Sequence, residues 1–296
     1  PSGVSYMIEN REIMMRMFPE LFESLNIEAV DSYPSYLVDI LKSLAPKKCK
    51  NDPKIVILTP GHLNSAYYEH SFLADLMGVE LVQGSDLFVN NNITYMKTTE
   101  GPQKIDIIYR RIDDEYLDPL YYKNDSLLGI PGVMNSYKTE NVNICSAPGA
   151  GLADDKAIYT FMPDIIKFYL GEEPILKNIK TWRCYDTKER KYVLNNLEKL
   201  VVKEVHGSGG YGMLIGSKAS KKELNIFKNK IEKVPDKFIA QPILKLSTVP
   251  IFDKTSLSER HVDLRPFSLI GHKKFKLVNG GLTRVALKKN SLIVNS

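Results

Sequence analysis

The chain has 296 residues, of which 43% are hydrophobic and 25% charged, proportions of an ordinary globular protein with room for one or two domains. Its net charge of +5 comes from 40 basic and 35 acidic side chains spread along the sequence, which excludes a dedicated nucleic-acid-binding arm. The cysteines Cys49, Cys145 and Cys184 lack metal-ligand spacing, so we expect a reduced, cytoplasmic location. No apolar run approaches the roughly 20 residues of a membrane span, so we expect no membrane partner.

Residues 1–50 are predicted to form an N-terminal helical segment. Apolar residues recur at helical spacing in the first part and predict one amphipathic helix over Ile8–Leu25. The residues that define this apolar face are Ile13, Met14, Met17, Phe18 and Leu21. Glu9, Asn10 and Arg11 fall in the first turn of that predicted helix. A second helix is expected over Tyr36–Leu44.

Residues 51–175 are predicted to form an α/β layer structure. Ile55–Leu58 is a continuous apolar run of the kind found in buried parallel strands, and a helix to Met77 and a strand at Val79–Val82 complete a βαβ unit. The further elements expected here are a hairpin over 87–97, strands at Ile105–Tyr109 and Val142–Cys145, and a helix over Ala157–Tyr169.

Polar loops follow two of these predicted strands. Asn64–His70 comes after the first strand, and Arg110–Asp114 comes directly after the strand that ends at Tyr109. Ligands of open α/β sheets bind beyond the carboxyl ends of the strands, so both loops are expected on one rim. For Asp113 and Asp114, surface ion pairs are an equally simple interpretation.

Residues 176–296 show fewer and shorter helices, as in an α+β domain. The expected elements are helices over Lys188–Leu197 and Lys221–Glu232, strands at Leu200–Lys203 and Phe238–Pro242, a hairpin of Val262–Ile270 with Phe275–Val278, and a last strand at Leu292–Val294.

A glycine-rich loop follows the strand that ends at Lys203. Its small residues are Gly207, Ser208, Gly209, Gly210 and Gly212, and an apolar strand resumes at Met213. Without Cβ atoms the backbone N–H groups can approach a phosphate, and a lysine can hold the phosphate charge. The spacing matches neither a P-loop nor a dinucleotide fingerprint. A nucleotide triphosphate site is therefore one interpretation, and an ordinary glycine hairpin with a surface lysine is the other.

The order of the motifs resembles the circularly permuted (type 2) ATP-grasp family related to glutathionylspermidine synthetase. The resemblance extends over nearly the whole chain. Seven separated motifs support it. They are residues 1–6 together with 9–11, residues 58–61 together with 64 and 68–70, residues 110–114, the Lys203 glycine loop, residues 240–242, residues 262–265 and residues 280–286.

This resemblance implies an ATP-grasp fold with an inserted pre-ATP-grasp-like α/β region, in which residues 176–296 are the nucleotide-binding part. ATP would lie between two α+β subdomains. Lys203 and the glycine loop would hold its phosphates, and the strand edge at Gln241 would face adenine. Arg265 and Arg284 would stabilise the transferred phosphoryl group as catalytic cations.

Polar residues near the first helix and the sheet rim are expected to bind the acceptor substrate. They are Ser2, Ser5, Asn10, Arg11, Asn64, Glu69 and Arg110. The acidic candidate for a metal ligand is Asp263, a single carboxylate that could equally form an ion pair with Arg265.

The function implied is an ATP-dependent carboxylate–amine ligase that works through an acylphosphate. It would use ATP and Mg²⁺ with small-molecule or peptide substrates. The alternative is a noncatalytic nucleotide-binding or scaffold protein that keeps the fold. An NAD-linked or P-loop enzyme lacks the glycine pattern it would need after Leu58. The sequence leaves the oligomeric state open.

Both ends of the chain depart from the family pattern. Relatives carry an acidic Glu-Asp-Asn segment that binds magnesium before the Pro-Ser-Gly-Val-Ser motif, and a Ser-Gln-Gly-Gly-Gly segment after the last residues. This sequence has neither segment. We therefore expect an internal fragment of a longer protein, which binds nucleotide weakly and is inactive by itself.

Overall fold

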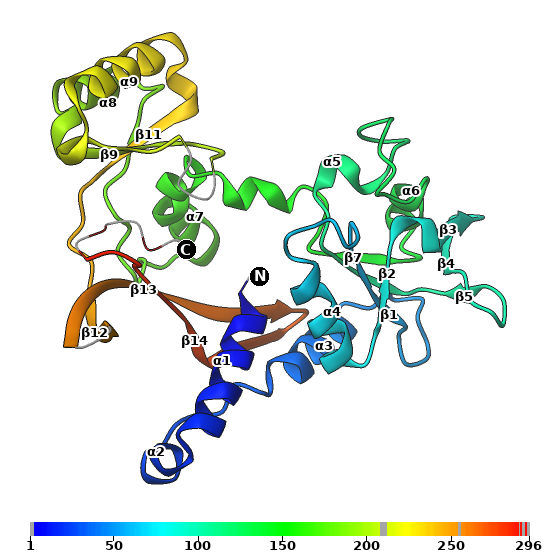
Figure 1. The fold of residues 1–296 in the computed structure, drawn as a ribbon. Coiled ribbons are helices and arrows are strands. Elements are labelled where there is room, and N and C mark those ends of the chain that lie inside the picture. The colour runs from blue at the N-terminus through cyan, green and yellow to red at the C-terminus, as the bar shows by residue number, and fades with distance from the viewer. Residues whose placement is uncertain (1–2, 208–211, 254–255, 290, 292–293, 295–296) are drawn as a thin grey trace. The chain divides into compact units, whose positions relative to one another are not determined.

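The computed structural model describes residues 3–207, 212–253, 256–289, 291 and 294 (Figure 1). Its contacts divide the chain into two compact units. The first takes in Pro1–Gly149 and Leu264–Thr283, and the second takes in Ala150–Asp263 and Arg284–Ser296.

The first unit is built on a parallel sheet with the strand order β2-β1-β6-β7. Its strands are β1 (Ile55–Leu58), β2 (Glu80–Val82), β6 (Ile107–Arg110) and β7 (Asn143–Cys145). Residues of β1 alternate between two apolar cores, with Ile57 in one and Val56 in the other. Burial on both faces explains why β1 is a continuous apolar run in the sequence. The predicted βαβ unit is confirmed.

Helices and a small antiparallel sheet cover the two faces of this parallel sheet. One core joins it to α1 (Val4–Met17), α3 (Tyr33–Ser43), α4 (Tyr67–Met77) and residues 267–278. The other core joins it to α6 (Val133–Lys138) and to the sheet of β3 (Leu87–Asn90), β4 (Ile93–Met96) and β5 (Gln103–Lys104). The short helices α2 (Pro19–Ser24), α5 (Asp114–Leu117) and η1 (Gly84–Asp86) complete the unit.

The single helix predicted over Ile8–Leu25 is wrong. Helix α1 begins at Val4 and ends at Met17, and α2 begins at Pro19. Proline restricts the residue before it to non-helical angles, and Phe18 accordingly has φ −135° and ψ 55°. Asn10 and Arg11 therefore lie in the interior of α1.

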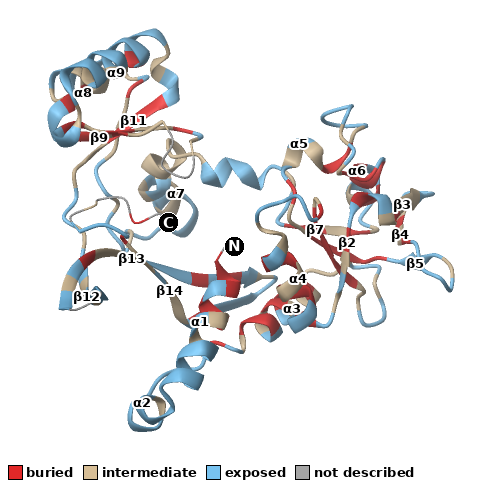
Figure 2. Ribbon diagram, in the orientation of Figure 1, coloured by how far each residue is buried: buried red, intermediate tan, exposed pale blue. Residues whose placement is uncertain are grey.

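The apolar face expected on this first helix is not buried within the described residues. Its members Ile13, Met14, Met17, Phe18 and Leu21 are 42–64% exposed. In Figure 2 the burial is confined to the beginning of α1, where Val4 and Met7 enter the core of the first unit.

The second unit contains an antiparallel sheet with the strand order β10-β9-β11-β8. Its strands are β8 (Trp182–Arg183), β9 (Leu200–Glu204), β10 (Leu214–Ile215) and β11 (Phe238–Pro242). Its helices are α7 (Met162–Leu170), α8 (Thr187–Asn195) and α9 (Lys221–Lys233), with short turns η2 (Ala150–Asp154), η3 (Ile158–Phe161), η4 (Leu197–Lys199), η5 (Gly216–Lys218) and η6 (Pro235–Lys237).

The helices α8 and α9 start where their capping residues place them. Asp186 accepts hydrogen bonds from the backbone N–H groups of Lys188 and Glu189. Ser220 and Glu223 form a capping box at the start of α9. Both helices pack on one face of the antiparallel sheet through Val193 and Ile231.

A third sheet has the order β12-β13-β14, with β12 at Thr248–Asp253, β13 at Ser256–Gly271 and β14 at Lys274–Val285. The predicted hairpin is confirmed, although its strands are longer than expected and β12 was not predicted. The last strand expected at Leu292–Val294 falls largely outside the described residues. The boundary between the two units runs through β13 and β14.

The compact units divide the chain differently from the three predicted segments. Residues 4–41 share a core with the parallel sheet, and residues 267–278 of the last third return to the same core. The predicted segments 1–50, 51–175 and 176–296 stay a prediction about domains. In the part of the chain that the structure describes, no helix is long and apolar enough to cross a membrane.

Candidate functional site

Strand alternation places Lys203 on the face of the antiparallel sheet that is turned away from its helices. Leu200 and Val202 of β9 enter the core beneath α8 and α9, so Val201 and Lys203 point to the opposite face. On β11 the same alternation exposes Gln241 on this opposite face. Gln241 lies directly across from Val201 in the register and is therefore a diagonal neighbour of Lys203.

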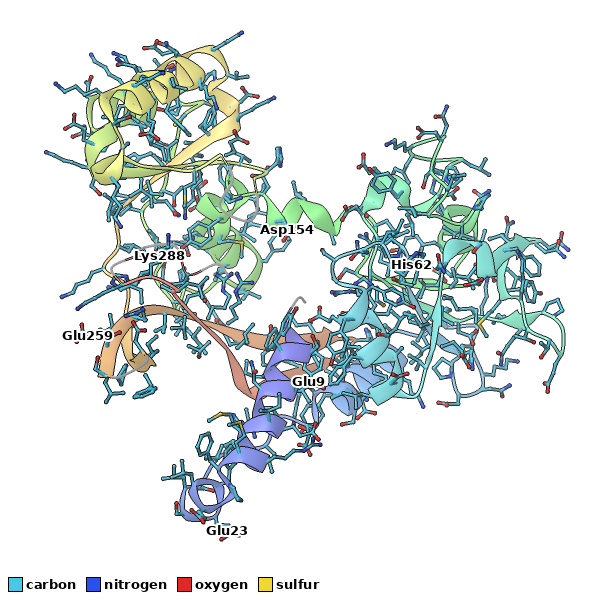
Figure 3. The ribbon with its side chains drawn as sticks, in the orientation of Figure 1. Glu9, Glu23, His62, Asp154, Glu259 and Lys288 are labelled. Carbon is cyan, nitrogen blue, oxygen red and sulfur yellow. The ribbon has the colours of Figure 1, made fainter. Side chains whose placement is uncertain are left out.

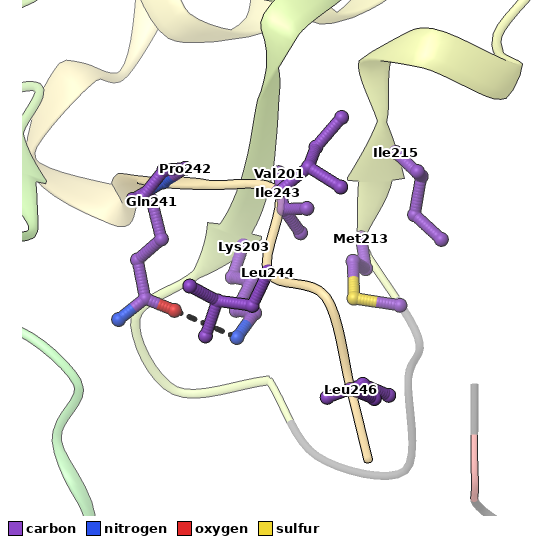
Figure 4. A pocket seen from close by; sticks show the side chains of 9 residues that line it. All are labelled: Val201, Lys203, Met213, Ile215, Gln241, Pro242, Ile243, Leu244 and Leu246. Carbon is purple, nitrogen blue, oxygen red and sulfur yellow. Dashed lines mark hydrogen bonds between the residues drawn. The ribbon is translucent and has the colours of Figure 1, made fainter. Parts of the chain in front are cut away.

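The two side chains meet in a pocket of otherwise apolar side chains (Figure 4). Lys203 Nζ donates a hydrogen bond of 2.8 Å to Gln241 Oε1. The other residues that line the pocket are Val201, Met213, Ile215, Pro242, Ile243, Leu244 and Leu246. An apolar cavity with one cation and one amide suits a ligand that has both a flat apolar part and a negative charge.

Burial lowers the pKa of Lys203 below its usual value, and the charge of the neighbouring Lys156 lowers it further. A cation in such surroundings is stabilised when an anion binds beside it. The positive charges of Lys203 and Lys156 therefore favour the binding of a negatively charged group in this pocket.

Lys156 is a candidate that the sequence did not single out. Its Nζ donates to the backbone oxygen of Val205 at 3.2 Å and to that of Gly207 at a shorter distance. It thus holds the first part of the glycine loop and adds a second cation near Lys203. No spacing marks it among the many lysines of the chain, because only the fold brings it to this loop.

At one described end of the glycine loop, the structure shows why a glycine is needed. Gly212 has φ +67°, a conformation that side chains rarely adopt, and a Cβ there would lie 2.6 Å from Cδ of Glu204. Gly207 has its carbonyl group held by Lys156. The predicted ligands Ser208, Gly209 and Gly210 lie outside the described residues.

Asp263 forms an ion pair with Arg284. Arg284 Nε donates to Asp263 Oδ1 at 2.9 Å, and Nη2 donates to Oδ2 at a shorter distance. An ion pair of Asp263 is therefore present, and Arg284 is a partner in it. Among the described residues no group of three or more His, Cys, Asp or Glu side chains could hold a metal ion. A metal role for Asp263 and catalytic roles for the two arginines stay predictions.

In the first unit the structure brings together two of the predicted substrate ligands, Ser5 and Glu69. Glu69 Oε2 accepts hydrogen bonds from Gly3 N at 2.6 Å and from Ser5 Oγ at 3.2 Å. Its Oε1 pairs with Arg111 Nη2 at 2.8 Å. Glu69 is only 4% exposed, so it joins α1, α4 and the end of β6 from inside the unit.

Arg110 is bound to the loops around it. Its guanidinium donates to the backbone oxygens of Ser146, Ile112 and Ala147 and pairs with Asp114 at 2.7 Å. The rim predicted from the sequence is real, since the polar residues after β1 and β6 do meet there. The contact to Glu69, however, is made by Arg111.

Of the remaining predicted substrate-binding residues, two form hydrogen bonds with other residues of the first unit, one is exposed, and one lies outside the described residues. Arg11 Nη1 donates to the backbone oxygen of Glu28. Asn64 Oδ1 accepts from the N–H of Ala66 at 2.9 Å, in the loop before α4 that also holds His62 (Figure 3). Asn10 is exposed on α1, and Ser2 is outside the described residues. Of the residues in this group that the structure describes, Asn10, Arg11 and Asn64, none forms a hydrogen bond with Glu69.

His70 is a buried histidine next to this network. Its Nδ1 lies 2.9 Å from Oγ1 of Thr59, which also accepts from the N–H of Gly61. Whether Thr59 or His70 is the donor depends on which ring nitrogen of the imidazole carries the proton. Burial, followed by the charge of Arg111, lowers the pKa of His70 from 6.5 to about 4.

Comparison with known proteins decides the family. Residues 1–286 match the family described as circularly permuted ATP-grasp type 2. The chain belongs to this family. Members of this family have the ATP-grasp fold. The mixed α/β and α+β architecture predicted from the sequence is confirmed.

Relatives of this ATP-grasp chain are longer than the chain. An uncharacterized protein of Synechocystis sp. is 50% identical over 296 residues, which are 100% of this chain and 61% of that protein. An uncharacterized protein of Mycobacterium tuberculosis is also 50% identical over 296 residues, which are 54% of its length. The chain thus spans somewhat more than half of these relatives.

Solved structures that resemble the chain include ATP-grasp ligase PsnB complexed with a minimal precursor. That likeness has a TM-score of 0.41 and 13% sequence identity, and it covers 79% of this chain and 76% of that one. It carries no argument about substrates.

We predict that Glu69→Ala destabilises this ATP-grasp chain by about 3 kcal/mol, because removing one partner of a buried ion pair leaves the other charge uncompensated. Glu69→Gln keeps the shape and should cost less. Urea unfolding followed by circular dichroism measures both, with the exposed Glu20→Ala as the control. A Glu69→Ala protein with the control's unfolding midpoint would show that the carboxylate is free for a ligand.

We predict that stability falls with acidification because of His70. Its pKa is about 4 in the folded chain and 6.5 when unperturbed, so the unfolded chain takes up a proton that the folded chain excludes. Stability is lost progressively below pH 6.5, by about 2 kcal/mol at about pH 5. In His70→Asn, whose Oδ1 can still accept from Thr59, this part of the pH dependence should disappear. Equal slopes of unfolding free energy against pH in both proteins would contradict the assignment.

Proposed function

We propose that this chain binds ATP in its second unit and is the nucleotide-binding part of an ATP-dependent carboxylate–amine ligase. The observation that carries the proposal is the pocket in which Lys203 and Gln241 face seven apolar side chains. Family membership supports the reaction class. The activity of the whole protein is included in this proposal.

ATP matches the pocket feature by feature. The apolar side chains offer surface to a purine ring, and the chain segment after Gln241 offers backbone groups at its edge. Lys203 and Lys156 offer two cations to the phosphates, and the glycine loop that begins at Gly207 offers N–H groups. A smaller anion would leave the apolar lining without a partner.

The proposed reaction has two steps. An oxygen of the substrate carboxylate attacks the γ-phosphorus of ATP, and ADP leaves with the electron pair of the broken bond. The amine nitrogen then attacks the carbonyl carbon of the acylphosphate, inorganic phosphate leaves, and the nitrogen loses a proton to give the amide. Arg265 and Arg284 are the proposed cations for the charge that develops. Arg284 would first exchange Asp263 for the phosphoryl oxygens.

Magnesium enters the proposal with the triphosphate, since cations that bridge its phosphates neutralise charge during transfer. The described residues do not fit a protein-built magnesium site. Asp263, the one candidate, is already neutralised by Arg284. No step of the proposal is therefore assigned to a metal ligand of this chain.

We also propose that the first unit binds the acceptor substrate, but through fewer residues than the sequence suggested. Ser5, Glu69 and Arg110 use their polar atoms within the unit, which supports a role in holding the frame of the rim. Among the described residues, Asn10 and Asn64 are exposed and are the better candidates for contact with a small-molecule or peptide substrate.

A noncatalytic nucleotide-binding protein is the second candidate, because Asp263 is occupied and the described residues hold no metal cluster. Measuring ATP binding and ADP release in parallel, with and without Mg²⁺, separates the two. Binding with Mg²⁺-dependent ADP release that an amine and a carboxylate accelerate supports the ligase. Binding without release by the chain and by the full-length Synechocystis relative would support the scaffold.

We predict that Lys203→Ala weakens ATP binding by roughly 10- to 100-fold, as expected for the loss of a charged hydrogen bond worth about 1.5–3 kcal/mol. Isothermal titration with ATP at fixed salt measures the change. Lys199→Ala is the matched control, since Lys199 is an exposed lysine just before the same strand. Unchanged affinity in a folded Lys203→Ala protein would remove Lys203 from the site.

A further inference from the structure

Next to the Lys203–Gln241 contact lies a third side chain, that of the residue directly before the next strand of the same sheet. Gln241 Nε2 donates a hydrogen bond of 2.9 Å to Thr181 Oγ1. Thr181 precedes β8, and the antiparallel register of β8 with β11 places it across from Gln241. Lys203, Gln241 and Thr181 therefore form a row across three neighbouring strands, β9, β11 and β8.

The hydrogen bonds in this row all run in one direction. A lysine ammonium only donates, so the amide of Gln241 must turn its oxygen toward Lys203. Its NH₂ group then faces Thr181, whose oxygen must accept. The hydroxyl proton of Thr181 is in turn donated to the backbone oxygen of Ile179 at 3.0 Å. The fixed carbonyl of Ile179 orients the Thr181 hydroxyl, and the Lys203 ammonium orients the amide of Gln241, so both ends of the row favour the same direction.

We propose that Thr181 is a positioning residue for Lys203 and that it acts through the amide of Gln241; this inference rests on the proposed ATP-binding role of Lys203. Without the Thr181 hydroxyl, the NH₂ group of Gln241 loses its acceptor, and Lys203 alone favours one orientation of the amide. A rotated amide would turn its NH₂ group toward the ammonium, so that two donors face each other and Lys203 loses its acceptor.

The surroundings of Lys203 make this acceptor important. The other side chains that line the pocket are all apolar, so the amide oxygen is the polar side-chain atom available to Lys203 among the described lining residues. Burial and Lys156 already lower the pKa of Lys203, and loss of the acceptor would lower it further. The hydroxyl of Thr181 thus holds the amide oxygen of Gln241 beside the Lys203 ammonium before nucleotide arrives.

The test compares Thr181→Val, which keeps the shape but removes the hydroxyl, with Thr181→Ser, which keeps the hydroxyl. Lys203 reactivity is measured first, by pulse acylation with acetic anhydride between about pH 7 and about pH 10 and quantification by mass spectrometry. Only the neutral amine reacts, so a lower pKa raises the labelling of Lys203 at a given pH. Thr181→Val should show this shift and Thr181→Ser should not, while Lys199 in the same digests stays unchanged.

ATP affinity is measured second, over the same pH range. Thr181→Val should bind ATP about threefold to tenfold more weakly, the effect of losing one hydrogen bond, and its affinity should decline at a lower pH than in the wild type. Thr181→Ser should restore both. If Thr181→Val does not fold, Gln241→Leu removes the acceptor directly and should give the same labelling shift.

The two measurements separate this inference from the proposed function. Wild-type labelling of Lys203 in Thr181→Val overturns the positioning role, even if the chain binds ATP. A labelling shift in a chain that never binds ATP supports the hydrogen-bonded row and overturns the proposed function. A uniform loss of thermal stability with an unchanged labelling profile would show that Thr181 is merely structural.

Discussion

One buried carboxylate holds the first unit together. Glu69 lies on α4, and its two oxygens accept hydrogen bonds from Gly3 and Ser5 at the start of α1 and from Arg111 after β6. A buried charge is tolerated only when it is paired and hydrogen-bonded, so these elements must meet in this arrangement. The positive end of the α1 dipole adds to the stabilisation. This requirement ties the start of α1 and the residue after β6 to α4.

In the second unit, the alternation of side chains along β9 fixes the position of Lys203. Leu200 and Val202 must face the helices to bury their apolar surface. Because side chains alternate along a strand, Lys203 must then lie on the opposite face of the sheet. A shift of the register by one residue would bury Lys203 and expose the core residues. The pocket is therefore fixed by the same hydrophobic burial that stabilises the sheet.

The parallel sheet, the hairpin and the strand that carries Lys203 could be predicted because local sequence determines them. Strands buried on both faces are continuous apolar runs, and the glycines after Lys203 are visible as a cluster. The break at Phe18 has a local signal in Pro19, but the apolar spacing continues across it and predicts one helix. Lys156 and Thr181 could not be predicted, because only tertiary pairing brings them to the loop and to Gln241.

The polar contacts of the two units differ in what a ligand would have to replace. Freeing Glu69 would remove the carboxylate from Arg111, whose side chain is only 13% exposed, at a cost of about 3–5 kcal/mol. Freeing Lys203 breaks one hydrogen bond to a neutral amide, worth about 1 kcal/mol, and a phosphate oxygen returns a stronger, charge-assisted one. The sequence shows Glu69 and Lys203 equally well as polar residues in motifs. The partner that each side chain has in the folded chain tells them apart: a buried ion pair indicates a structural role, and a hydrogen bond that is easily replaced indicates a residue that can bind a ligand. By this criterion Lys203 is free to exchange its partner for a ligand and Glu69 is not.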